Sequence, residues 1–238
     1  MKTYIRILLM GVIALLAFGT LSACSSGTKE ATETSEASGT SASPAPATPA
    51  PFPTSAKYIA DTKSADGKPM VIGIAVDGTE IAAYACNGTD DEAWFFGNQK
   101  DGKIDITSRF KDTLKAEFNG KDVVGDLTMN GVAFTFSAPA VPAPAGMYTA
   151  DFDGVRASWV VRPDGSATGV QFNGGISGRD FEQAELQQLN ELQFRNSVRN
   201  KRQLQQAQQI QVLANRSASS TINGRDVTPV LVNGNFRL

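Results

Sequence analysis

Asp-Gly and Asn-Gly dipeptides recur through residues 58–176 and divide this part of the chain into segments of strand length. Both dipeptides accept the positive φ angles that type I′ hairpin turns require, so each favours a tight reversal between two strands. The nine dipeptides are Asp66-Gly67, Asp77-Gly78, Asn87-Gly88, Asp101-Gly102, Asn119-Gly120, Asn130-Gly131, Asp153-Gly154, Asp164-Gly165 and Asn173-Gly174. Their spacing predicts an antiparallel β meander.

The hydrophobic pattern between these turns has the period of a β-strand. Leu114, Ala116 and Phe118 alternate with Lys115 and Glu117, which indicates one buried and one solvated face. Residues 70–76 are apolar on both faces and predict a central strand.

Residues 81–86 should pair with this central strand across the Asp77-Gly78 turn, which places Tyr84 and Cys86 on one face. Trp94-Phe95-Phe96 then sets three aromatic residues in a row, and alternation cannot bury all of them on a single face. Either Phe95 faces solvent or this strand is covered on both sides. We favour the second alternative, in which Phe95 belongs to the core.

The segment 177–216 has the signature of a helix. Ser177 is a plausible N-cap with Asp180 three residues later, and no glycine or proline follows Gly178 until after Arg216. Glutamine is dense here, and Leu186 and Leu204 fall on the same helical face, five turns apart. We expect one long Gln-rich helix, or a helical hairpin bent near residues 196–200.

Residues 217–238 are expected to form a C-terminal hairpin, with strands at 230–232 and 236–238 and turns at Asn223-Gly224 and Asn233-Gly234. The predicted fold is thus mainly β. An antiparallel meander at 58–176 forms a sandwich or a small barrel, and the helix and the hairpin follow it. Acidic residues outnumber basic ones in 58–176, whereas the reverse holds in 177–238, so the tail could lie on the β domain.

The first 23 residues have the three-part layout of a secretory signal. Lys2 and Arg6 precede an apolar run over residues 7–18, which is shorter than the roughly 20 residues of a membrane-spanning helix. Leu21-Ser22-Ala23-Cys24 closes the segment and resembles the lipobox of bacterial lipoproteins.

This resemblance implies cleavage between Ala23 and Cys24 and diacylglyceration of the Cys24 thiol. The lipid would hold the protein at the extracytoplasmic face of the cell membrane. Residues 24–57 are rich in Ser, Thr, Ala and Pro and are expected to form a disordered tether. In addition, Ala83-Tyr84-Ala85-Cys86-Asn87-Gly88, followed by Trp94 and Gly97, is similar to parts of uncharacterised actinobacterial envelope domains.

Composition narrows the function further. The chain has 22 Lys and Arg against 24 Asp and Glu, a net charge of −2, which does not suit a nucleic-acid partner. It contains no histidine, and its only cysteine besides Cys24 is Cys86, so histidine-based catalysis and tetrahedral Cys/His zinc sites are excluded. Asp90-Asp91-Glu92 and Asp151-Phe152-Asp153 do not match a calcium loop and indicate solvated turn charge.

We therefore expect no catalytic, cofactor or metal residues and a non-enzymatic interaction or structural role at the cell envelope, with envelope proteins binding the helical tail. One alternative is a carrier of a lipid or other apolar ligand in a β-barrel cavity. Its lining would be Trp94, Phe96, Phe134, Phe136 and Trp159. The second alternative is an envelope hydrolase with paired carboxylates.

Overall fold

A computed structural model describes residues 49–213 and 217–238, all of which belong to one compact unit of the chain. The signal segment, the cleavage site at Ala23 and Cys24, and most of the expected tether lie outside the described residues. Among the described residues, no helix is long and apolar enough to cross a membrane.

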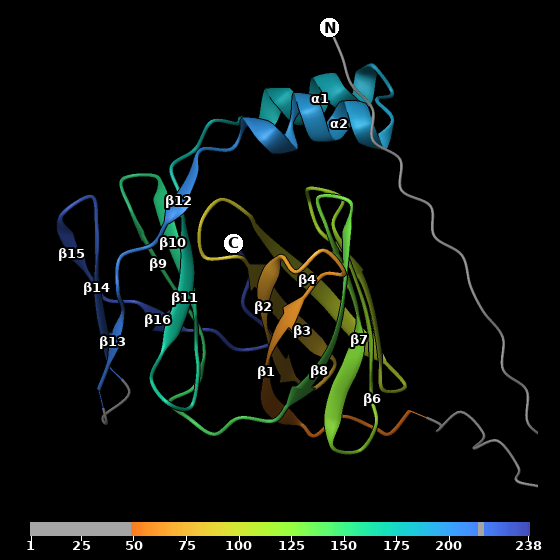
Figure 1. The fold of residues 1–238 in the computed structure, drawn as a ribbon, viewed down its shortest axis with the longest axis vertical. Coiled ribbons are helices and arrows are strands. Elements are labelled where there is room, and N and C mark those ends of the chain that lie inside the picture. The colour runs from red at the N-terminus through yellow and green to blue at the C-terminus, as the bar shows by residue number, and fades with distance from the viewer. Residues whose placement is uncertain (1–48, 214–216) are drawn as a thin grey trace, which may run out of the picture. The chain divides into compact units, whose positions relative to one another are not determined.

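The first sheet has eight strands that pair in chain order, each antiparallel to the next (Figure 1). They are β1 (Ser55–Lys63), β2 (Pro69–Asp77), β3 (Glu80–Cys86), β4 (Glu92–Lys100), β5 (Lys103–Thr107), β6 (Thr113–Phe118), β7 (Asp122–Met129) and β8 (Val132–Pro139). The two edges of the sheet meet, because Tyr58 in β1 bridges to Ala140 and the Val141 N–H donates to the Lys57 carbonyl at 2.8 Å. The sheet is therefore a nearly closed barrel, and the expected antiparallel meander is confirmed.

The turn dipeptides join successive strands as predicted. Both residues have positive φ at Asp101-Gly102 and Asn130-Gly131, which join β4 to β5 and β7 to β8. The β5–β6 connection has no such dipeptide, because residues 108–112 form it and Lys111 takes the positive φ of 63°. Strand β1 begins at Ser55, three residues before the expected start of the β domain.

Apolar side chains fill the barrel. Ile72, Phe95, Leu114 and Phe134 belong to one buried cluster, and the alternating burial of β5 and β6 matches the sequence pattern. Phe95 is fully buried in this cluster, while its neighbour Trp94 lies in a second cluster on the opposite face of β4. Strand β4 is thus covered on both sides, as favoured from its sequence.

The second sheet supplies that outer cover. Its order is β12-β11-β10-β9-β16, from β9 (Gly146–Phe152), β10 (Val155–Val161), β11 (Ala167–Phe172), β12 (Leu204–Gln206) and β16 (Val230–Leu231). Met147 and Val160 of this sheet pack with Tyr84, Cys86 and Trp94 of the barrel in the second buried cluster. A small third sheet contains β13 (Gln211–Val212), β14 (Ala218–Ile222) and β15 (Arg225–Val227).

The prediction of a long Gln-rich helix is wrong. Two short helices, α1 (Gly178–Leu186) and α2 (Glu191–Ser197), precede a 3₁₀ turn, η1 (Arg199–Lys201). Gln188 ends the first helical run with a φ of 49°, and Asn190 begins the second as an N-cap that accepts from the Gln193 N–H at 3.0 Å. The glutamines that follow lie partly in β12, which is paired with β11.

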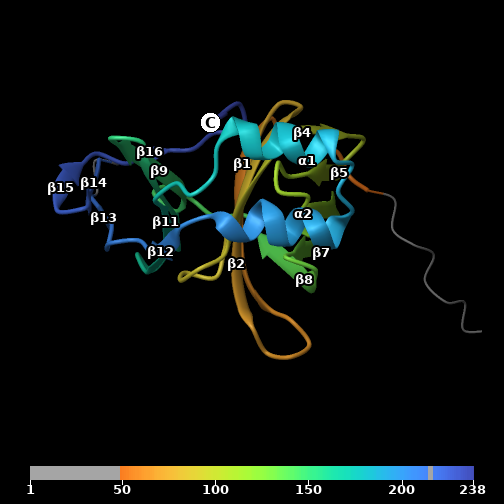
Figure 2. The same ribbon diagram turned by 90° about the horizontal axis from the view of Figure 1, so that it is seen from above.

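Figure 2 shows α1 and α2 side by side across one end of the barrel. The contacts agree with this position, since Phe181 in α1 packs against Phe110 and the Phe194 ring in α2 receives Lys111, both from the β5–β6 connection. The helices therefore cap the barrel at the end where this connection lies.

A C-terminal hairpin is present within residues 217–238 as predicted, but its strands are not the expected ones. The hairpin in this region is β14–β15, joined at Asn223-Gly224, whereas Val230 and Leu231 pair with Thr149 and Tyr148 of β9. Residues 236–238 are not in a strand. Residues 230 and 231 therefore pair with the edge of β9, which is distant in the sequence, and not with the residues that follow the turn at Asn233-Gly234.

Candidate functional site

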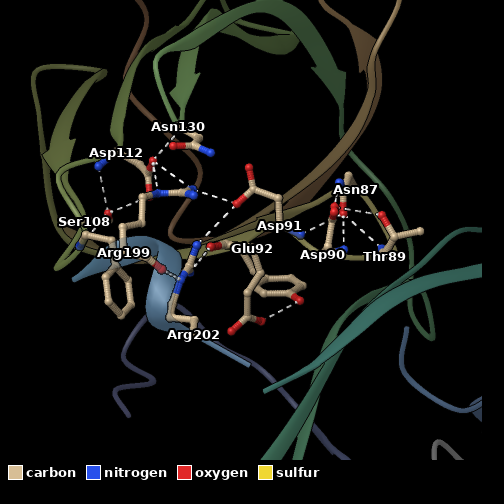
Figure 3. Close-up of polar contacts among 12 residues, drawn as sticks. Asn87, Thr89, Asp90, Asp91, Glu92, Ser108, Asp112, Asn130, Arg199 and Arg202 are labelled. Carbon is tan, nitrogen blue, oxygen red and sulfur yellow. Dashed lines mark hydrogen bonds and ion pairs between the residues drawn. The ribbon is translucent and has the colours of Figure 1, made fainter. Parts of the chain in front are cut away.

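Four charged side chains form a buried ion-pair network between the tail and the barrel, drawn in Figure 3 and called the arginine network below. Arg199 pairs with Asp112 at 3.1 Å and with Asp91 at 2.6 Å, and Arg202 approaches Asp91 at 3.4 Å. The side chains of Arg199 and Asp112 are only 3% and 2% exposed. Buried charges are tolerated when they are paired and hydrogen-bonded in this way.

Each member is held in place by local structure. η1 and the residue after it present Arg199 and Arg202 on the same side, and the Arg202 Nε donates to the Arg199 carbonyl at 3.0 Å. Asp112 is fixed from the barrel side, where its Oδ1 accepts from the Asn130 N–H at 2.9 Å and its own N–H donates to Ser108 Oγ. The network therefore joins the η1 segment to three barrel connections, which are those between β3 and β4, between β5 and β6, and between β7 and β8.

Asn87 shapes the β3–β4 connection that carries Asp91. Its Oδ1 accepts from the backbone N–H groups of Thr89, Asp90 and Asp91 at 2.9–3.0 Å (Figure 3). This local side-chain cap closes the turn and leaves the Asp91 side chain beside the two arginines.

A further buried carboxylate, Glu92, directly follows Asp91 in the chain. Its Oε2 accepts from the Tyr84 hydroxyl at 2.9 Å, and its Oε1 pairs with Arg156 of β10. The Glu92 backbone carbonyl accepts from Arg202 Nη1 at 2.6 Å. Glu92 thus links the barrel to the second sheet and to the arginine network.

Burial governs the protonation of these groups. Desolvation raises the pKa of Asp91 above its ordinary 3.8, because it outweighs the attraction of Arg199. Desolvation lowers the pKa of Arg202, and the neighbouring positive charge of Arg199 lowers it further. Burial also raises the pKa of the Cys86 thiol from 9.0 to about 12, so this cysteine is not a thiolate near neutral pH.

Two large cavities adjoin the arginine network, and Arg202 lines both. The first, of about 560 Å³, has a mixed lining that includes Lys68, Asn87 and Asn130 as well as Met70 and Met129. The second, of about 400 Å³, lies between β4 and the second sheet, and we call it the aromatic–arginine pocket. It is lined by Glu92, Ala93, Trp94, Phe96, Thr107, Ser108, Arg109, Phe110, Arg156, Phe172, Ile176, Arg202 and Leu238.

The structure separates the five aromatic residues that we considered for a carrier cavity. Trp94 and Phe96 lie together in the aromatic–arginine pocket, with ring centroids 5.5 Å apart. Phe134 and Phe136 belong to the core inside the barrel, and Trp159 belongs to a third cluster between the second and third sheets. They do not converge on one cavity.

The interpretation of Asp90-Asp91-Glu92 as solvated turn charge is wrong for two of its three residues. Asp90 is exposed, but Asp91 and Glu92 are turned inward onto arginines. Asp151-Phe152-Asp153 is exposed as expected. Among residues 49–213 and 217–238, no group of three or more His, Cys, Asp or Glu side chains could hold a metal ion.

Arg199, Arg202 and Arg156 were not predicted as site residues. The available signal was the opposite charge balance of the tail and the β region, which indicates attraction but not which pairs form. Chemically, this part of the molecule provides hydrogen-bond donors and aromatic surfaces, since its buried carboxylates already accept from arginines or tyrosine.

The fold and the site together define a nearly closed antiparallel barrel with a second sheet packed on its outer face and a ligand-sized pocket between them. Comparison with protein-family models, with curated proteins and with solved structures finds no match to this chain.

Proposed function

We propose that this protein is a lipid-anchored protein of the cell envelope, held at the extracytoplasmic face, that acts by binding and not by catalysis. The lipobox resemblance at Leu21-Ser22-Ala23-Cys24 supports the anchor. The stretch between Cys24 and the start of β1 at Ser55 supports a tether that lets the barrel move relative to the membrane.

One observation carries the non-enzymatic part of the proposal: the buried carboxylates beside the cavities are already engaged. Asp91 and Asp112 pair with Arg199, and Glu92 pairs with Arg156. A hydrolase would need carboxylates free to exchange a proton or to attack a substrate. The Cys86 thiol, fully buried and with its pKa raised to about 12, is equally unsuited to attack.

A role in carrying a small ligand is the second candidate, and the position of the cavities favours a site outside the barrel. Apolar side chains occupy the barrel interior, whereas the aromatic–arginine pocket lies between the barrel and the second sheet. Junctions between packed units are common places for small-molecule sites.

Partner proteins are proposed to bind the capping helices. Leu186 in α1 and Leu192 in α2 are 83% and 62% exposed, which leaves apolar surface on this cap.

The anchor is tested by comparing two cysteine variants in membrane fractionation. We expect wild-type protein and Cys86→Ala to sediment with membranes and to incorporate a labelled fatty acid, because both keep the Cys24 thiol. Cys24→Ala should lose the label and should no longer be held in the membrane fraction by lipid. Equal labelling of Cys24→Ala and wild type would contradict the lipid anchor.

A further inference from the structure

We infer that the aromatic–arginine pocket is a binding site for a flat aromatic carboxylate. This inference rests on the proposed binding role, for which it names a site and a ligand class, and it is independent of the lipid anchor. Two unsatisfied donors, a ring-lined wall and an excess of positive charge support it.

Two residues that line the pocket each carry a buried donor with no hydrogen-bond partner among the described residues. These donors are the indole Nε1 of Trp94 and the guanidinium Nε of Arg156. Trp94 is only 7% exposed, so water in bulk does not satisfy its N–H. A buried donor without an acceptor is costly, and a ligand that brings an acceptor removes this cost.

The pocket has more positive than negative charge. Arg109, Arg156 and Arg202 line it, and Glu92, already paired with Arg156, is its only carboxylate side chain. Arg109 is exposed and has no ion-pair partner among the residues that the structure describes. The acceptor that fits these donors is therefore an anion, and guanidinium groups bind carboxylates with favourable geometry.

Aromatic rings form the apolar part of the wall. Trp94 and Phe96 are stacked with an interplanar angle of 15°, and Phe110 and Phe172 also line the cavity. Arg202 lies 4.4 Å from the centre of the Phe110 ring, and Arg156 lies 5.2 Å from that of Phe172, so charge and ring are held side by side. Ring walls favour a flat ring over a flexible chain, because offset and edge-to-face contacts add to simple burial.

The size of the pocket agrees with this ligand class. Its volume of about 400 Å³ is in the range of small-molecule sites and would take a one- or two-ring acid. The ligand carboxylate would accept from the Trp94 and Arg156 donors, with Arg109 at the entrance and the rings of the wall against its apolar body.

The test is isothermal titration calorimetry on the purified full-length chain with 2-naphthoate as the probe. We expect one site per chain, and binding of the neutral analogue 2-naphthalenemethanol weaker by about tenfold, because it lacks the charged acceptor. Decanoate, an anion with a flexible chain, should also bind more weakly than 2-naphthoate.

Three variants place the binding in this pocket. Arg109→Gln should weaken 2-naphthoate binding by roughly fivefold, since it removes a charge at an exposed site. Trp94→Phe should weaken it by about tenfold, because the indole N–H donor is lost together with part of the ring surface of the wall. Arg225→Gln, at an exposed arginine that is not in the pocket wall, is the matched control and should leave binding unchanged.

Circular dichroism establishes whether each variant is folded. If Trp94→Phe does not fold, Arg109→Gln still tests whether the probe binds in this pocket. Absence of 2-naphthoate binding to folded wild-type protein would overturn the inference, as would binding that Arg109→Gln leaves unchanged. Tighter binding of decanoate would overturn the aromatic part and indicate an acyl chain instead. None of these results bears on the membrane fractionation of the cysteine variants.

Discussion

At the scale of single residues, Cys86 shows how burial suppresses chemistry that its side chain could otherwise perform. The thiol is fully buried on β3, next to Tyr84 on the same face, and donates to the Thr168 carbonyl at 3.8 Å. Desolvation raises its pKa from 9.0 to about 12. The same apolar surroundings that make it part of the core make its thiolate unfavourable.

This raised pKa predicts a loss of stability in alkali. The folded state holds the thiol proton more tightly than the unfolded state, so the stabilisation is complete below about pH 9 and declines as the pH rises toward 12. We expect the free energy of unfolding to fall by about 1 kcal/mol more in wild type than in Cys86→Ala between pH 8 and pH 10. Urea unfolding at both pH values measures this difference, and parallel losses in the two proteins would argue against it.

At the scale of elements, the arginine network links the tail to the barrel within a segment that the sequence predicts as one long helix. η1 is a single 3₁₀ turn, yet it places Arg199 against Asp112 and Asp91, which come from two different parts of the barrel. Residues 199–202 therefore stabilise the contact between tail and barrel by the positions of their arginines, and a long helix is not needed for this.

The energetic importance of this link can be measured by Arg199→Met. The substitution leaves the carboxylates of Asp112 and Asp91 buried with less compensation, so we expect a loss of about 3–5 kcal/mol in the free energy of unfolding. Arg225→Met, at an exposed arginine, should change it by less than about 0.5 kcal/mol. Urea denaturation followed by circular dichroism provides both values, and a loss in Arg199→Met as small as that of the control would show that the network does not stabilise the fold.

Elements defined by short-range signals were predictable from the sequence, and those defined by distant partners were not. The hairpins follow from Asp-Gly and Asn-Gly turns, whose φ preferences act over two residues. The glutamine-rich segment has no such signal for a strand, and its pairing with β11 depends on an edge that exists only after the second sheet has formed. By contrast, Asn190 and Gln193 have the spacing of a capping box, which is a short-range signal. It predicts a new helix start within the expected long helix.

The candidate site was predictable only in part, for the same reason. Trp94 and Phe96 were considered as ligand contacts because they are aromatic. Their pocket also needs Arg156 and Phe172 from the second sheet and Arg202 from the tail, which are distant in the chain. A single sequence does not reveal which distant segments will pack together.

At the scale of the whole molecule, the barrel and the second sheet share one apolar core. Tyr84, Cys86 and Trp94 on the outer face of the barrel are buried in one cluster with Met147 and Val160 of the second sheet. Separation of the two sheets would expose this surface and would also break the Glu92–Arg156 pair. The described residues should therefore unfold together.

The two tryptophans of the chain allow this prediction to be tested, because each reports on a different place. Trp94 lies between the barrel and the second sheet, and Trp159 lies between the second and third sheets, where its Nε1 donates to the Gln208 carbonyl at 2.8 Å. In Trp94→Phe the fluorescence follows Trp159, and in Trp159→Phe it follows Trp94. Within each variant we expect the urea midpoint from fluorescence to coincide with that from far-ultraviolet circular dichroism, to which all the strands contribute. A Trp159 transition at lower urea than the circular dichroism transition would instead mean that the second sheet detaches first. The aromatic–arginine pocket would then be formed by two units that separate more readily than either of them unfolds.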